Sequence, residues 1–251
     1  HDLVLMEAAA KLGGQVLIGT AGSWRKDLIG IVDWRAQELE RLGARVLLNI
    51  YAGIEEVIAE APDVVIIATG GVPDIDWIDG AQFCTSAWDV LSGQAPVGDN
   101  VVVYDGTGRH PAATCAEYVA RAGKQVSLVT MDGVFGAELT YSERVIWKQK
   151  LYGHNIPVTL DHRLDKVGRS GNKFAVHLIN EVTGIPVELV ADQIIVEHGT
   201  SPADDLYHDL RSRSFNDGVT DIDNLLAGRA QPWDRNSDGS FELHRIGDAV
   251  T

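Results

Sequence analysis

The apolar residues of this chain fall into short runs, separated by stretches in which apolar positions recur with helical spacing. The runs predict buried strands, and the spaced stretches predict helices. Between residues 25 and 43, apolar side chains at 28, 31, 32, 39 and 42 would share one face of a helix that ends at Gly43. In the first part of the chain the pattern predicts strands at 2–7, 44–52 and 63–70, and helices at 25–43 and 54–61.

The second part of the chain continues this alternation. Strands are predicted at 100–108, 124–130 and 156–160, and helices at 111–122 and 143–151. The runs 173–180 and 186–199 flank the turn EVTG, and they predict an antiparallel hairpin followed by a buried strand. Residues 200–240 are polar and predict a long return connection to a last strand at 242–247.

Glycines follow several of the predicted strands directly. Residues 63–73 read DVVIIATGGVP, residues 99–113 read DNVVVYDGTGRHPAA, and residues 242–249 read ELHRIGDA. A strand that opens through glycines into a helix N-terminus can cradle a pyrophosphate. We therefore expect two interleaved nucleotide-binding domains, the first comprising 1–97 plus 236–251 and the second 98–235.

Glu7 ends the first predicted strand and is the first candidate ligand contact. A carboxylate at this position of a dinucleotide-binding fold can accept hydrogen bonds from the ribose hydroxyls of an adenosine. Gly13, Gly14 and Gln15 follow, and the glycine pair allows the backbone to approach a cofactor closely. The alternatives are a solvated acid and an ordinary loop.

Two further candidate pairs come after strands. Thr69 and Gly70 end a buried strand at the carboxyl edge of the expected sheet, where open α/β folds bind ligands. Gly247 and Asp248 follow the last strand, and an acid there can orient a ribityl or phosphate group through a helix N-terminus or a bridging water. The alternatives are a turn that needs a positive φ at Gly70 and a helix N-cap at Asp248.

The second Gly-rich turn is a damaged dinucleotide fingerprint. Gly106 and Gly108 match the motif, but Pro111 stands where a third glycine would allow close packing of helix on strand. Thr130 occupies the place of the ribose-binding acid, and Asp132 is displaced from it by two positions. The turn therefore argues against binding of NAD(P).

Composition narrows the possible functions. The formal net charge of −15 argues against nucleic acid or an anionic membrane as a partner, and no apolar run approaches the length of about 20 residues that a membrane helix needs. Cys84 and Cys115 belong to no CxxC motif, and both a disulfide between them and two thiols in a reducing compartment fit the sequence. The 8 histidines show no metal-ligand spacing. We expect a cytoplasmic protein, with no metal site and no catalytic residue in this chain.

The ends of the sequence suggest a piece of a longer protein. Residue 1 is His1 rather than methionine, and a strand follows at once. The chain begins at what would be the second strand of a βαβ unit, so we expect the first strand and its Gly-rich turn to be missing.

The segments LMEAAAKLGGQ, VIIATGGVP, VVVYDGTGRHPAATCAEYVARAGKQVSLVT and HRIGDA resemble the C-terminal half of trimethylamine dehydrogenase and 2,4-dienoyl-CoA reductase type flavin oxidoreductases. The resemblance is strongest to dimethylamine dehydrogenase and N-methylproline demethylase-like proteins. It implies an α/β fold of two Rossmann-like, glutathione-reductase-type domains, one inserted in the other. It also implies FAD or ADP in the first domain, with Glu7 on the ribose, Gly13 to Gln15 lining the cofactor and Asp248 on the flavin or phosphate side. FMN and a 4Fe–4S cluster are expected only in an N-terminal barrel outside this sequence.

The resemblance leaves several functions open. The first is a C-terminal piece of an amine dehydrogenase, demethylase or NADH:flavin oxidoreductase that contributes nucleotide binding and electron-transfer scaffolding and is inactive when isolated. The second is an NAD(P)H-dependent reductase of the 2,4-dienoyl-CoA reductase type. The third is a docking module without chemistry. The partners implied are the N-terminal barrel of the same chain, an electron-transfer flavoprotein, and further copies in a homo-oligomer.

Overall fold

A computed structural model describes residues 2–232 and 235–250. It divides into two compact units. Unit 1 holds the described residues within 1–12, 39–72 and 200–251, and unit 2 holds residues 13–38 and 73–199. Helix α2 (Ile29–Arg41) contributes its residues up to Glu38 to unit 2 and its last turn to unit 1.

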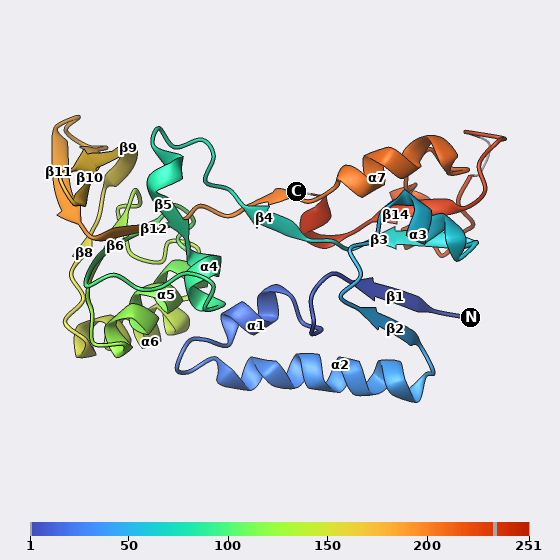
Figure 1. The fold of residues 1–251 in the computed structure, drawn as a ribbon, viewed down its shortest axis with the longest axis horizontal. Helices are drawn as coiled ribbons and strands as arrows, with labels where there is room; N and C mark the ends of the chain where they lie inside the picture. The colour runs from blue at the N-terminus through green and yellow to red at the C-terminus, as the bar shows by residue number, and fades with distance from the viewer. Residues whose placement is uncertain (1, 233–234, 251) are drawn as a thin grey trace. The chain divides into compact units, whose positions relative to one another are not determined.

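Unit 2 is built on a five-stranded parallel sheet with the strand order β5-β12-β6-β7-β8 (Figure 1). Its strands are β5 (Cys84–Ser86), β6 (Asn100–Asp105), β7 (Gln125–Thr130), β8 (Val158–Thr159) and β12 (Gln193–Glu197). The central strand β6 reads NVVVYD, and every residue after Asn100 is buried. Continuous apolar runs of this kind are typical of parallel strands that are covered on both faces.

Helices cover one face of this sheet. They are α1 (Gln15–Gly19), α4 (Ala87–Leu91), α5 (His110–Arg121) and α6 (Tyr141–Gly153). Because side chains alternate along a strand, Val101 and Val103 of β6 point to this helical layer. Ala112 and Ala116 of α5 pack there, and such small side chains let the helix lie close to the sheet.

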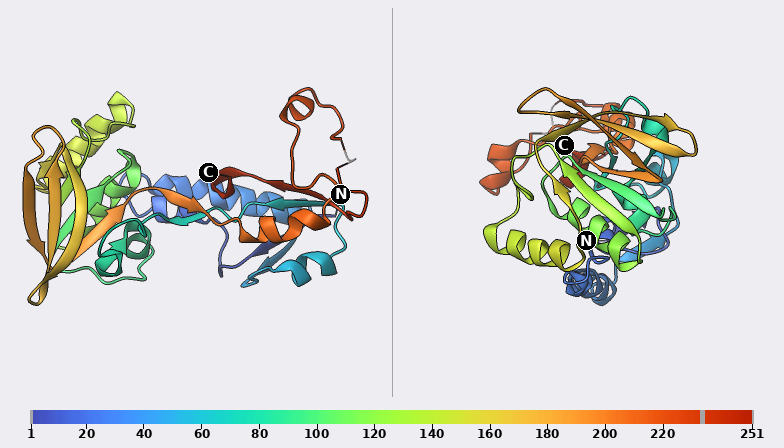
Figure 2. Two further views of the ribbon diagram at one scale, coloured as in Figure 1. Left: turned by 90° about the horizontal axis from the view of Figure 1, so that it is seen from above. Right: turned by 90° about the vertical axis from the view of Figure 1, so that its left-hand side faces the viewer.

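A three-stranded antiparallel sheet covers the other face (Figure 2). Its strands are β9 (His162–Ser170), β10 (Lys173–Asn180) and β11 (Pro186–Ala191). Val102 and Tyr104 of β6 pack against Leu164 and Val176 of this sheet. The hairpin of β10 and β11 followed by the buried parallel strand β12 confirms the prediction for 173–199. Strand β9 was not predicted.

Unit 1 contains shorter strand pairs. Strand β1 (Val4–Glu7) pairs in parallel with β2 (Arg45–Leu48), and β3 (Val64–Ile67) pairs in parallel with β14 (Glu242–Arg245). Strand β4 (Gly71–Pro73) pairs with β13 (Thr200–Pro202). Its helices are α3 (Ile54–Ala59), α7 (Asp205–Leu210) and α8 (Ile222–Leu226), with 3-10 turns at Arg211–Arg213 and Gly247–Ala249. Val65 and Ile67 pack with Leu210, Phe241 and Leu243 in a core of their own.

The expectation of two Rossmann-like domains, one inserted in the other and lacking its first strand, was wrong. The structure is an α/β fold with one five-stranded parallel sheet, and the parallel strands of unit 1 occur as separate two-stranded pairs. Val64 and Ile66 of β3 are 49% and 57% exposed, whereas the strands of a doubly wound sheet are covered on both faces. The apolar runs predicted most of the strands, but they carry no information on which strands join into one sheet.

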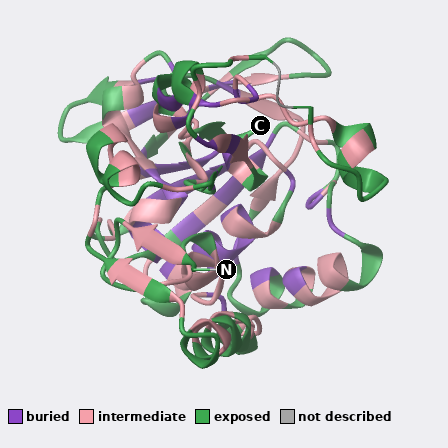
Figure 3. Ribbon diagram, turned by 90° about the vertical axis from the view of Figure 1, so that its right-hand side faces the viewer, coloured by how far each residue is buried: buried purple, intermediate pink, exposed green. Residues whose placement is uncertain are grey.

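Several details also differ from the sequence predictions. The expected helix over 25–43 begins with a 3-10 turn at Lys26–Leu28 and continues as α2. None of the residues of α2 is fully buried (Figure 3). The expected connection over 200–240 contains α7 and α8. Strand β14 pairs with β3, and the proposed domain boundaries stay a prediction. Cys84 and Cys115 are free thiols. Among the described residues no helix is both long enough and apolar enough to cross a membrane.

Candidate functional site

The ten residues predicted to contact a cofactor divide between the two units. Unit 1 holds Glu7, Thr69, Gly70, Gly247 and Asp248, and unit 2 holds Gly13, Gly14, Gln15, Gly106 and Gly108. Within each unit they follow strands or precede helices.

At the edge of unit 1, Glu7 is the last residue of β1 and is half-buried. One of its carboxylate oxygens accepts the Ala9 N–H at 2.8 Å. The Glu7 carbonyl accepts the Ile50 N–H at 3.0 Å, and Asn49 donates to the Ala9 carbonyl at 3.1 Å. The turn after β1 is therefore tied to the turn after β2, and it presents the Glu7 side chain at the end of the strand.

Thr69 and Gly70 hold the chain together after β3. The Thr69 hydroxyl donates to the Ala203 carbonyl, and Ala203 donates its N–H to the Gly70 carbonyl at 3.0 Å. A Cβ on the next residue, Gly71, would lie 2.7 Å from the Ser201 carbonyl oxygen. These contacts are structural, because they fix the segment that carries β4 to the segment that carries β13. A role in nucleotide binding stays a prediction.

Gly247 and Asp248 form the turn after β14. Gly247 has a φ of 61°, in the left-handed region, and space is open around the position of a Cβ. Arg245 fixes this turn by donating to the Ala249 carbonyl at 3.3 Å and to the Asp204 carboxylate. Strands β1, β3 and β14 run in the same direction (Figure 1), and Glu7 ends β1 while Asp248 lies in the turn after β14.

The glycine pair in unit 2 begins α1. Gly14 is the N-cap with a φ of 47° and a ψ of −129°, and nothing lies within 4 Å of the position of its Cβ. Gly13 has a φ of 127°, and a Cβ there would come 2.8 Å from the Leu17 Cγ. Both glycines are therefore required by the turn itself, and Gly14 leaves its backbone open to a ligand.

The loop between β6 and α5 has the local geometry of an anion cradle, but its donors are already used. One Asp105 oxygen, Oδ1, accepts the N–H groups of Thr107 at 3.1 Å and of Gly108 at 2.8 Å. A Cβ on Gly106 would lie 2.3 Å from the His198 ring. The side chain of this chain's own Asp105 thus takes the backbone amides that a ligand phosphate would need.

Sequence reasoning missed two carboxyl groups at this edge. Asp105 and Glu197 are the last residues of β6 and β12, lie opposite each other in register, and are 0% and 5% exposed. Burial raises the pKa of Asp105 to about 6 and the pKa of Glu197 to about 7. The charge of Asp132 also raises the pKa of Asp105, and the charge of Asp105 also raises the pKa of Glu197, whereas Arg109 opposes the shift at Glu197. An acid that directly ends an apolar run was the available sequence signal.

An aromatic cluster lies at the N-terminus of α5. The buried Trp147 indole donates to His110 Nδ1 at 3.0 Å, and His110 Nε2 lies 3.3 Å from a Glu143 oxygen. The accepting Nδ1 identifies the neutral tautomer, with the proton on Nε2. Burial, followed by the charge of Arg25, lowers the pKa of His110. Trp24 packs edge-on against Trp147 with ring centroids 5.6 Å apart.

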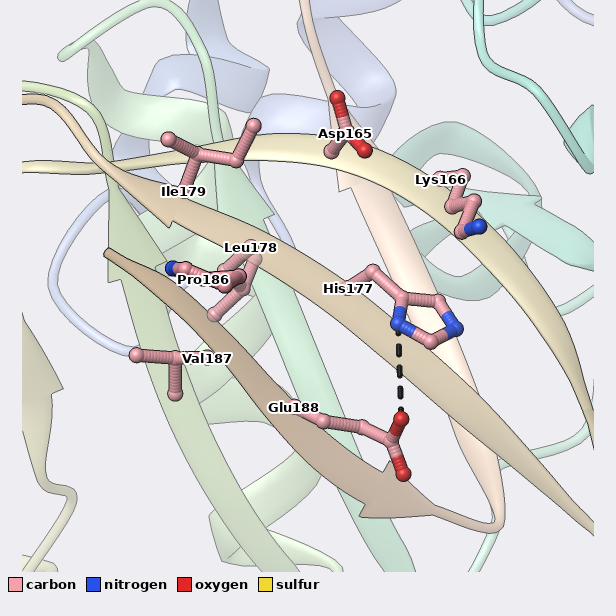
Figure 4. Close-up of a pocket in the computed structure, with 8 residues that line it drawn as sticks. All are labelled: Asp165, Lys166, His177, Leu178, Ile179, Pro186, Val187 and Glu188. Carbon is pink, nitrogen blue, oxygen red and sulfur yellow. Dashed lines mark ion pairs between the residues drawn. The ribbon is translucent and has the colours of Figure 1, made fainter. Parts of the chain in front are cut away.

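The cleft in Figure 4 lies on the antiparallel sheet of unit 2 and has a volume of about 410 Å³. His177 of β10 and Glu188 of β11 face each other across it, with Nδ1 and a carboxylate oxygen 3.5 Å apart. None of the predicted cofactor residues lines this cleft. In the described part of the chain no three His, Cys, Asp or Glu residues are grouped so that they could hold a metal ion.

Comparison with known proteins finds similar sequences, although no family model matches the chain. The chain is 42% identical over 255 residues to a multifunctional alkene reductase/demethylase from Caballeronia cordobensis, which covers 99% of the chain and 37% of that protein. It is 39% identical over 251 residues to a probable N-methylproline demethylase from Rhizobium meliloti, covering 100% of the chain and 37% of that protein. It is 33% identical to an N,N-dimethylglycine/sarcosine dehydrogenase from Chromohalobacter salexigens, covering 38% of that protein. The chain thus spans little more than a third of these relatives.

Solved structures share the fold over the whole chain. A 2-naphthoyl-CoA reductase complex matches with a TM-score of 0.80 at 24% identity over 33% of its length. A histamine dehydrogenase from Rhizobium sp. 4-9 matches with a TM-score of 0.77 at 20% identity over 37% of its length. The chain therefore shares its fold with parts of these larger enzymes.

Proposed function

This chain is homologous to part of the flavin oxidoreductases of the trimethylamine dehydrogenase and 2,4-dienoyl-CoA reductase type, and we propose that it is their nucleotide-binding and electron-transfer scaffold. In this proposal the edge of unit 1 holds FAD or ADP, and the edge of unit 2 takes no nicotinamide nucleotide. Oxidation of an N-methylated amine or amino acid takes place outside these residues, and electrons leave to a carrier such as an electron-transfer flavoprotein. The whole protein assembles as a homo-oligomer.

The observation that carries the proposal is the Asp105 carboxylate inside the Gly-rich loop of unit 2. It accepts two backbone N–H groups at 2.8 and 3.1 Å. A pyrophosphate entering this loop would have to displace a buried carboxylate and would meet its negative charge. Asp132 adds a second carboxylate, because its Oδ2 lies 2.8 Å from the position of a Gly108 Cβ. The loop therefore supports a scaffolding role better than binding of NAD(P)H.

The residues at the edge of unit 1 fit an adenine nucleotide. Glu7 offers a half-buried carboxylate at the end of a parallel strand, where it can accept ribose hydroxyls. Gly247 leaves open space around its backbone, and the following Asp248 sits in the same turn. When a flavin is bound, it supplies the redox chemistry. The residues of this chain bind and orient the nucleotide.

A relative of another kind supports a second candidate function. The chain is 37% identical over 136 residues to an NADH oxidase from Thermoanaerobacter brockii, which covers 52% of the chain and 21% of that protein. This favours an NAD(P)H-dependent reductase, in which the loop of unit 2 would accept the nucleotide that delivers the electrons.

Stopped-flow reduction of the full-length flavoprotein separates the two functions. We expect no bleaching of the flavin by NADH or NADPH at sub-millimolar concentration, and rapid bleaching by an N-methylated substrate. Reduction by either nicotinamide nucleotide within seconds would establish the reductase and reject the scaffolding role of unit 2.

The nucleotide site of unit 1 is tested by replacing Glu7 in the same full-length protein. Glu7→Gln should weaken binding of ADP or FAD by about 1–3 kcal/mol, because hydrogen bonds to a charged acceptor are lost. Glu55→Gln is a matched control, since this exposed acid of unit 1 lies in the first turn of α3. Equal affinities for the two variants, measured by calorimetry, would show that Glu7 does not contact the nucleotide.

A further inference from the structure

Two buried carboxyl groups lie at the carboxyl edge of the parallel sheet, and the proposed function uses Asp105 only as a barrier to a nucleotide and gives Glu197 no role. Asp105 ends β6 and Glu197 ends β12, and the two residues are direct partners in the parallel register of these strands. Asp105 is fully buried, and Glu197 is 5% exposed. Neighbouring parallel strands lie about 4.8 Å apart, so two negative charges here would repel each other in a poorly hydrated place.

Each carboxyl group fastens the loop that leaves its own strand. Asp105 Oδ1 accepts the N–H groups of Thr107 and Gly108. Glu197 Oε1 accepts the N–H of Gly199 at 3.3 Å, and its backbone carbonyl accepts the Gly106 N–H at 2.8 Å. The two loops are therefore connected to each other through these two strand ends.

The hydrogen bonds do not satisfy two full charges. Asp105 Oδ2 is buried and has no hydrogen-bond partner among the described residues. An ionised carboxylate with a buried, unpartnered oxygen is costly, whereas the protonated group is much less so. Both the unpartnered Oδ2 of Asp105 and the position of Asp105 opposite Glu197 therefore favour a proton bound to this pair.

The groups around the pair do not remove this preference. Asp132, which follows β7, acts on Asp105 with a charge of the same sign, and Tyr104 lies beside Asp105 on β6. Arg109 opposes the effect at Glu197, but burial outweighs it. His198 does not neutralise Glu197 directly, because its Nδ1 lies 3.2 Å from an Asp74 oxygen and its ring packs at a tilt against Trp77. Cys115 of α5 faces Glu197 as a buried thiol.

We propose that Asp105 and Glu197 form a proton-binding pair that keeps the two loops at this edge closed while it holds a proton and loosens them when both groups are ionised. Opening exposes the carboxylates to water, so the open form binds protons less tightly than the closed form. By linkage, raising the pH must then favour opening. Since open α/β sheets bind ligands at the carboxyl ends of their strands, the pair would make any docking at this edge depend on proton uptake.

The pKa values set the range of pH in which this happens. Burial raises the pKa of Asp105 from 3.8 to about 6 and the pKa of Glu197 from 4.5 to about 7. The bound protons therefore favour the closed loops fully at a pH below the ordinary pKa values of 3.8 and 4.5. This preference for the closed form is lost as the pH rises through about 6 for Asp105 and about 7 for Glu197. Each unit of pKa difference between the closed and open forms changes the ratio of the two forms about tenfold.

Amide hydrogen exchange on the 251-residue chain tests the proposal directly. Protection factors, corrected for the intrinsic effect of pH, are measured at Thr107, Gly108 and Gly199 at pH 5.5 and 8.5. We expect protection to fall by at least about tenfold at the higher pH. In Glu197→Gln the fall should be strongly reduced, because one titrating group is lost while the acceptor for Gly199 remains.

Glu138→Gln provides a matched control, and carboxyl NMR provides a second measurement. Glu138→Gln removes an exposed acid whose backbone N–H contacts the Gly108 carbonyl, and it should keep the wild-type dependence on pH. Carboxyl ¹³C NMR of the unmodified chain needs no variant and should show both groups titrating above pH 5. Protection that does not depend on pH, or titration of both groups near their ordinary values, would overturn the proposal.

Discussion

Replacing Glu197 by glutamine should stabilise the protein at alkaline pH, although it removes a charged group that accepts a hydrogen bond. Glu197 is 5% exposed at the end of β12. Burial raises its pKa from 4.5 to about 7, with Arg109 as the opposing charge. Ionisation of this side chain therefore works against folding, whereas glutamine of nearly the same shape stays neutral and still accepts the Gly199 N–H.

The sign and the size follow from linkage. A folded-state pKa above the unfolded one contributes stability that is complete below pH 4.5 and is lost as the pH rises through about 7. The difference of about 2.5 pKa units corresponds to about 3 kcal/mol at 1.36 kcal/mol per unit. The wild-type free energy of unfolding should fall by up to about this amount between pH 4.5 and 8.5. Glu197→Gln should lack this part of the slope.

Urea unfolding at pH 5.0 and 8.5, followed by tryptophan fluorescence, measures both effects. We expect Glu197→Gln to match the wild type within about 1 kcal/mol at pH 5.0 and to exceed it by about 2–3 kcal/mol at pH 8.5. The exposed acid Glu138 provides the matched control, and Glu138→Gln should change stability by less than about 0.5 kcal/mol at both values. If Glu197→Gln shows the wild-type slope, Glu197 is not a buried group with a raised pKa, and the reasoning fails.

Two further predictions concern unit 2, one on a glycine that packs against the backbone and one on the pKa of His110. Gly80→Ala should destabilise the protein by more than about 2 kcal/mol, because the residue has a φ of +92° and its Cβ would lie 1.9 Å from the Val167 carbonyl oxygen. Gly123→Ala has a φ of +76° without a steric clash and should cost about 1 kcal/mol, so equal losses in thermal unfolding would contradict the argument. Trp147→Phe should raise the pKa of His110 in an NMR titration, because the indole N–H that now occupies Nδ1 is lost; an unchanged titration would show that this bond does not hold the neutral form.

The sequence located the elements around the central strand well. Strands predicted at 100–108 and 124–130 are observed at Asn100–Asp105 and Gln125–Thr130, and the helix predicted at 111–122 is observed at His110–Arg121. These elements depend on local information, namely apolar runs, a proline at the helix start and a glycine after its end. Residues 200–240 were harder, because short helices such as α7 bury few side chains, among them Tyr207 and Leu210.

The candidate site shows the same division at the level of single residues. Gly106 and Gly108 were recognised because a Gly-rich turn after a strand is a local pattern. That the amides of this turn are held by Asp105 could not be predicted, since an acid at a strand end can equally point to solvent. The part played by Glu197 depends on the pairing of β12 with β6, across a sequence separation that no local pattern spans.

By itself the sequence determined most of the strands, several of the helices between them, the relatives to which the chain is similar and the residues that could contact a nucleotide. The tertiary structure alone decided that the strands form one five-stranded sheet and separate pairs instead of two complete sheets. It also decided that two carboxyl groups distant in sequence share one buried edge. The physical reason is that periodicity and turn chemistry act over a few residues, whereas strand pairing, burial and the pKa shifts that burial causes depend on neighbours that only the folded chain brings together.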